Sequence, residues 1–533
     1  MSSLWRAGRT PVPSTPFAPG RHEVVVVGAG ITGLSTALML ARSGRDVAVV
    51  EAGDVAELST GANTGKVSLL QGSVLGQLRR HHSASLVRAY VDSNRAGQEW
   101  LTAFAEEEGV PFTRRAAYSF AESADALPGV REQIRAGVEA GLPVQWRDAS
   151  EIEDAPFPVA GAAVLENQIA IDPVAVADAL ARAFVAAGGT LHTATRVCDV
   201  HAVPHAMVQT DAGALRADRI VLATGTPIID RGLYFAKTRG MRSLCVAFDV
   251  DGGVPEGMYL SLDELSHSIR AVSPADGPSG RARLIVGGGG HPVGRTRSES
   301  ALYDELVDWT SRHFPGARET HRWSAQDYES HNLVPFVGAM PRTLGRVRFA
   351  TGFNKWGLTN GPAAALRIAA EIAGVPFRER PAWMIALGTR LTVPADLGRG
   401  LRENALVGRE AARGWTLAEA TPVPLPRPAE GEGAVGNRAG VPVGVSTVGG
   451  VTRAVSAVCP HLGGVLAWND AECTWDCPLH ASRFAPDGTR LEGPAVEDLR
   501  RLGRGALESE GNGQGGAPVR TDGADGSRSP ARR

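Results

Sequence analysis

A glycine-rich turn placed directly after an apolar run narrows the fold of this chain more than any other feature. Residues 24–27 are four consecutive valines, which is typical of a parallel strand buried on both faces. Residues 28–33 (GAGITG) follow, and apolar residues then recur at helical spacing to about Ser43. A strand, a tight turn and a helix in this order begin a βαβ unit. We therefore expect an α/β fold with a parallel sheet.

The spacing of the glycines predicts a dinucleotide-binding turn. Gly28 permits the tight turn, Gly30 lets the backbone approach a pyrophosphate, and Gly33 allows close packing of the helix on the sheet. The following helix directs its positive dipole end at the phosphates. Ile31 and Thr32, between the last two glycines, complete the predicted contact set. An ordinary glycine-rich turn is the minor alternative.

Glu51 supports the dinucleotide interpretation from the end of the next predicted strand, residues 46–51. It lies 18 residues after Gly33, where its carboxylate can accept hydrogen bonds from a ribose diol. A carboxylate here also repels a 2′-phosphate, so an NADP-like ligand is disfavoured. The motif by itself does not separate FAD from NAD.

Two later segments favour FAD. Residues 218–225 (DRIVLATG) and 348–353 (RFATGF) are predicted strands that reach Gly225 and Gly352. The first resembles a FAD-contacting strand of flavoprotein disulfide reductases and amine oxidases, and the second repeats its pattern. Residues 354–361 (NKWGLTNG) follow, and a helix that includes Gly357 and Thr359 is predicted there. A glycine-rich turn before a helix offers backbone N–H groups and a positive dipole end.

A second site is indicated near the C-terminus by clustered cysteines and histidines. The chain has only five cysteines, an odd number that makes a poor disulfide framework. Cys459 and His461 form a C-x-H pattern, and Cys477 and His480 form a C-x-x-H pattern. In a Rieske centre two thiolates hold one iron and two imidazoles hold the other. A zinc ribbon takes the same ligand types, so the spacing alone leaves zinc open.

The flanking residues resemble known families. Residues 22–375 are similar to the D-amino-acid-oxidase superfamily of FAD-dependent oxidoreductases, which includes glycine and sarcosine oxidases, and above all to its subgroup with a C-terminal Rieske domain. Residues 59–66 (STGANTGK) resemble the subgroup's flavin-contacting loop, which implies cofactor contacts for Thr64, Gly65 and Lys66. The resemblance also places Lys355 beside the isoalloxazine, with a catalytic or a packing role.

The C-terminal loops resemble Rieske domains beyond their four ligands, through the segments HLG, LAWN, WDCP and SRF. This resemblance implies a [2Fe–2S] cluster and leaves zinc as a minority interpretation. Respiratory Rieske domains carry a disulfide where this chain has Gly464 and Leu479, so that bridge cannot form here. Ser482 is retained, but Phe484 replaces the usual tyrosine. One hydrogen bond toward the cluster is then missing, which predicts a potential below respiratory values.

These features divide the chain into five parts. We expect a flexible leader (1–21), a FAD-dependent oxidoreductase domain (22–400), a linker (401–434), a Rieske domain (435–504) and a disordered tail (505–533). The expected fold class is α/β: a Rossmann-like FAD-binding domain with an interleaved α+β substrate domain, plus a C-terminal all-β Rieske domain. Charged residues make up 21% of the chain and the net charge is −2, so neither nucleic acid nor membrane is an expected partner. We expect a cytoplasmic protein.

The resemblance implies a FAD-dependent dehydrogenase or oxidase. We expect it to oxidise a C–N bond of an amine or amino-acid-like small molecule, with hydride transfer to the flavin. The cluster carries single electrons, so it would relay them to or from an external acceptor or donor. Arg239, in a segment similar to the start of the family's substrate domain, is a candidate to bind a substrate carboxylate or is simply structural. The alternatives are a flavin and iron–sulfur redox sensor or electron-transfer protein, and a natural-product tailoring oxidoreductase.

Overall fold

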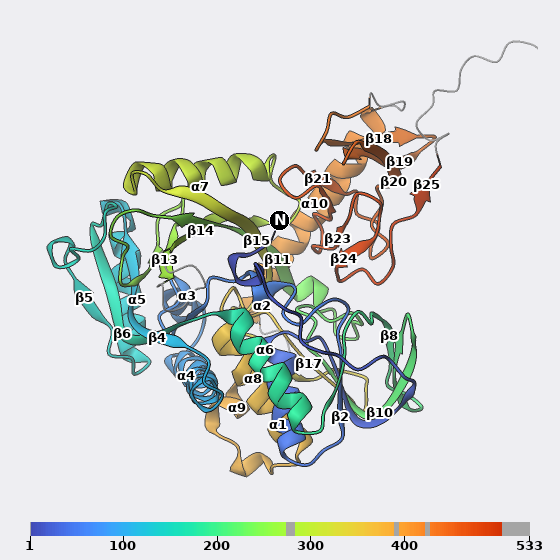
Figure 1. Cartoon of the computed structure of the whole chain (residues 1–533), viewed down its shortest axis with the longest axis horizontal. Coiled ribbons are helices and arrows are strands. Elements are labelled where there is room, and N and C mark those ends of the chain that lie inside the picture. Colours follow the sequence, from blue (N-terminus) through green and yellow to red (C-terminus); the bar gives the residue numbers. More distant parts are fainter. Residues whose placement is uncertain (1, 273–282, 389–393, 422–426, 504–533) are drawn as a thin grey trace, which may run out of the picture.

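The computed structural model describes residues 2–272, 283–388, 394–421 and 427–503 (Figure 1). Its first sheet has the order β16-β17-β10-β1-β2-β7, and β8 and β9 extend it beside β10. The strands are β1 (Gly20–Val27), β2 (Val47–Val50), β7 (Thr190–His192), β8 (Val197–His201), β9 (Ala206–Thr210), β10 (Gly213–Leu222), β16 (Phe336–Ala339) and β17 (Val347–Thr351). The central pairs β10–β1, β1–β2 and β2–β7 are parallel, which confirms the predicted α/β core.

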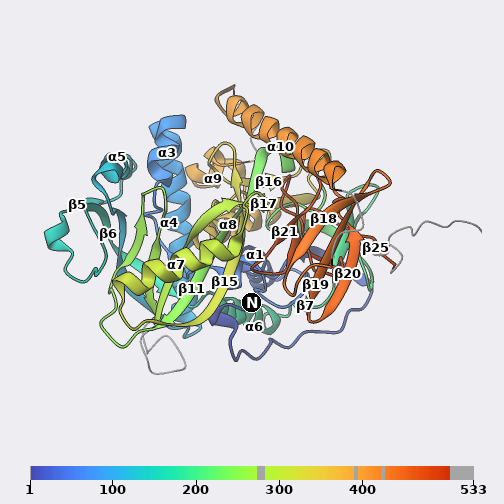
Figure 2. The ribbon, with the colours of Figure 1, turned by 90° about the horizontal axis from the view of Figure 1, so that it is seen from above.

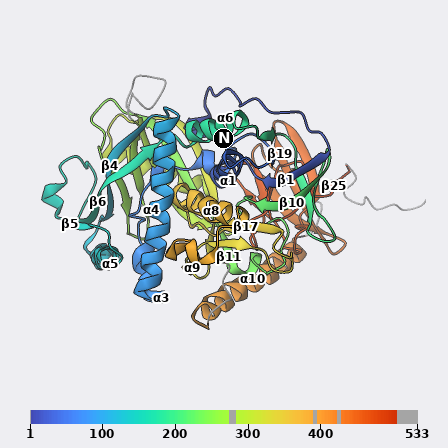
Figure 3. The same ribbon diagram turned by 90° about the horizontal axis from the view of Figure 1, so that it is seen from below.

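Three helices pack on this sheet, and their apolar side chains form one core with the buried valines of its strands. They are α1 (Ile31–Arg42), α6 (Pro173–Ala186) and α8 (Gly357–Ile372). Val24 and Val26 of β1 belong to the core that these helices close, together with Leu34 and Leu38 of α1. Figure 3 shows α8 between α1 and the long helix α4 (Ala84–Glu107), which belongs to the neighbouring layer.

A second, nine-stranded sheet forms the interleaved α+β part, in the order β15-β11-β14-β13-β12-β4-β6-β3 with β5 beside β6. Its strands are β3 (Lys66–Val67), β4 (Phe112–Ala121), β5 (Gln145–Arg147), β6 (Gly161–Ile171), β11 (Thr238–Asp249), β12 (Met258–Ser261), β13 (Ser268–Val272), β14 (Arg283–Pro292) and β15 (Arg318–Ser330). The remaining helices of these layers are α2 (Ser59–Ala62), α3 (Val74–His81), α5 (Leu127–Glu139), α7 (Glu299–His313) and α9 (Ala382–Ala386).

The C-terminal domain is all-β, as expected, and consists of two four-stranded sheets. One contains β18 (Gly433–Arg438), β19 (Val441–Val448), β20 (Val451–Ser456) and β25 (Arg501–Leu502). The other contains β21 (Ala467–Asn469), β22 (Thr474–Asp476), β23 (Arg483–Phe484) and β24 (Arg490–Glu492). In Figures 1 and 2 this domain lies against the layers that the first two sheets form. Within the described residues, none of the helices has the length and apolarity needed to span a membrane.

Two segments that were expected to be a flexible leader and a linker contain helical structure. Near the start of the chain, Leu4 and Trp5 are buried in a short 3-10 helix, and the Trp5 indole donates to the Asn63 carbonyl at 2.8 Å. Residues 394–420 form helix α10 (Pro394–Ala420), which runs from near α9 to the C-terminal domain (Figure 2). In both places aromatic or long side chains anchor a segment whose composition suggested a flexible chain. The predicted tail, residues 505–533, lies outside the described residues.

Candidate dinucleotide cavity and cluster site

The turn after β1 needs glycine at two of its positions for steric reasons. Gly28 has a φ of +106°, and a Cβ there would lie 2.5 Å from the Ala223 carbonyl oxygen. A Cβ on Gly33 would lie 1.9 Å from the carbonyl oxygen of Gly28. The first glycine therefore lets β1 pass close to the end of β10, and the third lets α1 pack on the turn. Any side chain at these glycine positions would occupy the turn. Because glycine has none, the backbone can approach a pyrophosphate there, and the residues present fit such a group.

Glu51 follows β2 directly and lies half-buried at the same edge of the sheet. Its carboxylate accepts hydrogen bonds from the amides of Ala29 at 2.7 Å and Gly53 at 2.9 Å. Burial raises the pKa of Glu51, and these two amides partly oppose the rise. The side chain is thus held in one orientation while keeping lone pairs for a ribose hydroxyl.

A cavity of about 600 Å³ opens between the two sheets and extends from this turn. Ten of the predicted site residues line it: Gly28, Gly30, Ile31, Thr32, Glu51, Thr64, Lys66, Gly225, Lys355 and Gly357. They come from segments far apart in the sequence and converge on one space. A cavity of this size with a glycine cradle at one end suits a bound dinucleotide.

The other predicted residues lie outside the cavity lining, and several have structural reasons to be where they are. Gly33 supports the turn, and Gly65 makes room for Arg270, whose guanidinium nitrogen would lie 2.1 Å from a Cβ at position 65. Gly352 has a φ of +82° and faces Ser330. The Thr359 hydroxyl is buried and donates to Asn94 at 2.5 Å.

Arg239 also lies away from the cavity lining, because two carboxylates hold its guanidinium. It contacts Glu329 at 2.7 Å and Glu403 of α10 at 3.6 Å. A substrate carboxylate would have to compete with both. The geometry therefore favours the structural alternative for Arg239 over the substrate-binding one.

Three other charged side chains, Lys66, Lys355 and Asp327, line the cavity. Lys66 donates to the Tyr259 carbonyl at 2.7 Å and to the Ser268 hydroxyl at 2.8 Å, and burial lowers its pKa to about 7. Lys355 is surrounded by protein yet open to the cavity, and burial lowers its pKa too. Burial raises the pKa of Asp327 to about 6, although its carboxylate accepts from the Lys355 amide. No sequence motif marks Asp327 as a site residue. Its place in the cavity wall follows only from its position in β15.

The two cysteine–histidine loops bring all four predicted cluster ligands together. The Cys459 and Cys477 thiols hydrogen-bond to each other, which lowers the pKa of Cys459 to about 7 and raises that of Cys477. The His461 and His480 rings lie 5.2 Å apart, and the ring of Phe235 contacts both edge-on. The thiols thus form one pair and the imidazoles another, as a two-iron cluster requires.

His480 provides a direct test of fit for a metal. Its Nδ1 is buried, and no hydrogen-bond partner for it exists among the described residues. Burial lowers the pKa of His480 to about 4, so the ring is neutral, the form that binds a metal. A pair of thiols beside a pair of imidazoles is the ligand arrangement of a cluster with two ligands per iron.

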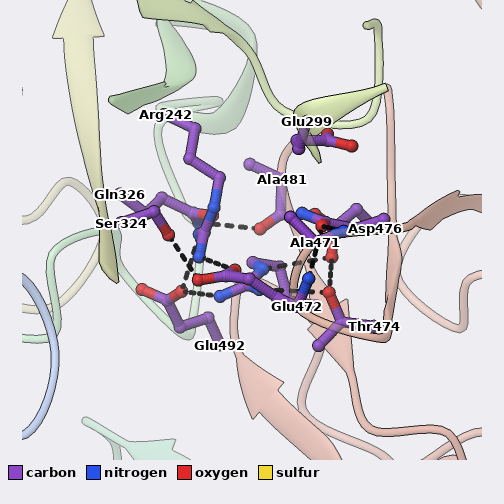
Figure 4. A network of polar contacts seen from close by, with 12 residues as sticks. Arg242, Glu299, Ser324, Gln326, Ala471, Glu472, Thr474, Asp476, Ala481 and Glu492 are labelled. Carbon is purple, nitrogen blue, oxygen red and sulfur yellow. Dashed lines mark hydrogen bonds and ion pairs between the residues drawn. The ribbon is translucent and has the colours of Figure 1, made fainter. Parts of the chain in front are cut away.

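Buried charges dock the C-terminal domain onto the second sheet (Figure 4). Arg242 of β11 pairs with Glu472, which also binds Arg483 and accepts from the Ser324 hydroxyl at 2.6 Å. Burial raises the pKa of Glu472, but Arg483 and Arg242 outweigh it and hold the value at about 2. The two domains therefore share an ion network in which each charge has a partner.

A second set of contacts connects the cluster loop to the cavity wall. Gln326 of β15 donates to the carbonyl of Ala481 at 2.8 Å, and Ala481 directly follows the predicted ligand His480. A Cβ on Gly240 would lie 2.2 Å from that of Ala481, so only glycine admits the loop there. Gln326 itself lines the cavity. The cluster loop and the dinucleotide cavity thus share one wall.

Together, the fold and these two sites define a flavoprotein oxidoreductase with an attached iron–sulfur domain. Residues 23–371 match the FAD dependent oxidoreductase (DAO) family, and residues 427–503 match the Rieske [2Fe-2S] domain. The chain belongs to the DAO family of FAD-dependent oxidoreductases and carries a C-terminal Rieske domain. Its cofactors are FAD and a [2Fe–2S] cluster, as the sequence predicted.

Individual relatives agree with this assignment. The chain is 28% identical over 510 residues to YhfW of Bacillus subtilis (strain 168), named as a Rieske 2Fe-2S iron-sulfur protein; the match covers 94% of this chain and 97% of YhfW. Glycine oxidase from Geobacillus kaustophilus has the same fold over 70% of this chain and 99% of its own, with a TM-score of 0.57 and 19% identity. The L-amino acid deaminase of Proteus myxofaciens, in complex with anthranilate, covers 72% and 95%, with a TM-score of 0.56 and 19% identity.

Proposed function

We propose that this oxidoreductase oxidises the C–N bond of an amine or amino-acid-like small molecule and exchanges single electrons with an external partner through its Rieske cluster. Bound FAD supplies a hydride acceptor, and the cluster supplies a one-electron carrier. The names of its relatives, a glycine oxidase and an L-amino acid deaminase, support the choice of bond.

The charges in the cavity support an amino-acid-like substrate. Lys66 and Lys355 are cations placed to attract a carboxylate, and Asp327 is placed to attract an amino group. A substrate with both groups would be oriented at two points, which is how a small cavity fixes a reacting bond. These residues bind and orient, whereas Arg239 has its own carboxylate partners.

The contact between Gln326 and Ala481 is the observation that carries the relay part of the proposal. It connects a wall of the flavin cavity to the residue next to a cluster ligand. A protein that passed both electrons directly to oxygen would gain nothing from this placement. A fixed cluster beside the flavin suits an electron exchange that does not require domain motion.

Anaerobic titration of the purified holoenzyme with amines and amino acids tests both parts. Flavin bleaching followed by the EPR signal of the reduced cluster is the expected sequence for a substrate. Cys477→Ser is the matched control, since its flavin should still bleach and no cluster signal should follow. If no amine or amino acid bleaches the flavin although dithionite does, C–N oxidation is wrong. Bleaching that leaves the cluster oxidised would overturn the relay and keep the oxidation.

A further inference from the structure

One segment of the Rieske domain lies along the cavity that the flavoprotein motifs build. Arg490, Leu491, Glu492, Gly493 and Ala495 line the same space as the glycine turn. They belong to β24 and the turn after it, on the side of the domain that faces the flavoprotein (Figure 1). The dinucleotide motif therefore accounts for only part of the cavity wall.

Contacts at two points define where residues 490–495 lie along the cavity. Arg490 is close enough to Arg196 for the two charges to affect each other, and Arg196 follows Thr195, whose amide donates to the Glu51 carbonyl at 2.8 Å. Further along, the Gly493 carbonyl accepts from the Tyr328 hydroxyl at 2.9 Å. The segment thus extends from the ribose-binding end of the cavity toward the strand that carries Gln326.

Two arginines lie near each other at the first of these points, and the described residues give neither of them an ion pair. Arg490 is only 4% exposed, and its guanidinium donates to the Ala495 carbonyl at 3.0 Å. Within the described ranges, neither Arg490 nor Arg196 has an acidic side chain at ion-pair distance. Burial, followed by the repulsion of Arg196, lowers the pKa of Arg490, and the more distant carboxylates of Asp498 and Asp211 only partly oppose the fall. Buried cations are costly unless an anion compensates them.

The diphosphate of FAD has the charge that this pair lacks. It carries two negative charges, and both arginines border the cavity in which FAD would bind. A guanidinium offers several N–H donors in one plane, which suits phosphate oxygens.

We propose that the Rieske domain forms part of the FAD site, with residues 490–495 closing one side of the cavity and Arg490, together with Arg196, neutralising the FAD diphosphate. Tight flavin binding then requires the docked Rieske domain, whatever substrate the enzyme oxidises. FAD retention therefore becomes a property of the interface as well as of the glycine motif.

Arg490→Gln in the full-length protein tests the assignment. It should weaken FAD binding about tenfold or more, because a charge-assisted hydrogen bond contributes at least that factor. Flavin fluorescence during reconstitution of the flavin-free protein gives the Kd, and the EPR spectrum of the cluster reports whether the Rieske domain remains folded. Arg501→Gln is the matched control, since Arg501 of the same domain pairs with Asp487 at the surface and should leave the Kd unchanged.

Competition with ADP and with adenosine distinguishes the diphosphate from simple packing. Arg490→Gln should weaken ADP binding strongly and adenosine binding little, and Arg490→Lys should restore most of the ADP affinity. If ADP and adenosine weaken equally, or if FAD binds normally beside an intact EPR signal, the assignment is wrong. Should Arg490→Gln abolish the EPR signal, Arg196→Gln provides the same test from the flavoprotein side, with the same expected loss of FAD and ADP affinity.

Discussion

The two cofactor sites of this molecule are built in opposite ways. The cluster site uses residues 459–480, whose two loops close on their own hydrogen bonds, such as that from the Gly463 amide to the Cys459 carbonyl at 2.9 Å. The FAD cavity gathers segments of two sheets and one edge of the Rieske domain. A local site depends mainly on its own loops, whereas a distributed site depends on how domains dock. Damage to the first should therefore stay local, and damage to the interface should reach the second.

Removal of a cluster ligand gives the largest expected effect and tests that separation. Cys477→Ser should abolish the iron signal completely, because one iron loses a thiolate, while FAD content stays close to that of the wild type. Iron analysis, EPR and flavin absorbance measure both. Cys473→Ser is the control, since Cys473 lies outside the ligand pattern and should keep the cluster. Loss of FAD together with iron would show that the two sites are not separable.

Breaking the shared ion network should destabilise the interface next. Glu472→Ala leaves Arg242, whose side chain is 3% exposed, without its main partner. Removing one partner of a buried pair costs about 3–5 kcal/mol, seen as a lower urea midpoint and as faster release of FAD. Glu107→Gln, at an exposed pair with Arg42, should change stability little. An unchanged midpoint for Glu472→Ala would mean that the domains are held by other contacts.

The same carboxylate predicts an acid limit for docking. Its pKa is depressed to about 2 in the folded protein, so its contribution is complete above the ordinary glutamate value of 4.5 and is lost as the pH falls toward 2. FAD release measured between pH 5 and 3 should therefore accelerate in the wild type. Glu472→Gln should release FAD quickly at every pH in that range, and an acid dependence equal to that of the wild type would contradict this role.

The contrast between the local cluster site and the distributed FAD cavity also explains which site residues could be predicted from the sequence. Cys459, His461, Cys477 and His480 were identified from spacing and flanks, because all four lie in two short loops. Ten residues of the cavity were likewise predicted, some through strand–turn–helix patterns and others, such as Thr64, Lys66 and Lys355, through the resemblance to the oxidoreductase superfamily. Residues that reach a site only by tertiary packing, such as Asp327 and Arg490, have no local signature. The helix α10 was missed because the proline-rich stretch near it suggested a linker throughout.

The charges in the cavity predict a narrow pH optimum for an amino acid substrate. Burial raises the pKa of Asp327 to about 6, so its anion forms above that pH, and burial lowers the pKa of Lys66 to about 7, so its cation is lost above that pH. The value of kcat/KM should therefore be highest between the two and fall on both sides. Lys66→Gln should lower the maximum and remove the alkaline decline only. An alkaline limb that persists in this variant would assign it to another group.

The smallest expected effect concerns the potential of the cluster. Phe484 is fully buried in the core that also contains Cys459, Cys477 and Trp475. Phe484→Tyr would place a hydroxyl near the thiolates, and a donor stabilises the reduced, more negative cluster. A hydrogen bond of about 1 kcal/mol corresponds to a rise of roughly 40 mV for a one-electron couple. An EPR-monitored redox titration measures the shift, with Phe353→Tyr, in the flavoprotein, as the control that should leave the potential unchanged. A potential that stays constant or falls in Phe484→Tyr would show that this phenylalanine does not set the low potential predicted for the domain. Solvent exposure or the charges around His461 would then have to set it.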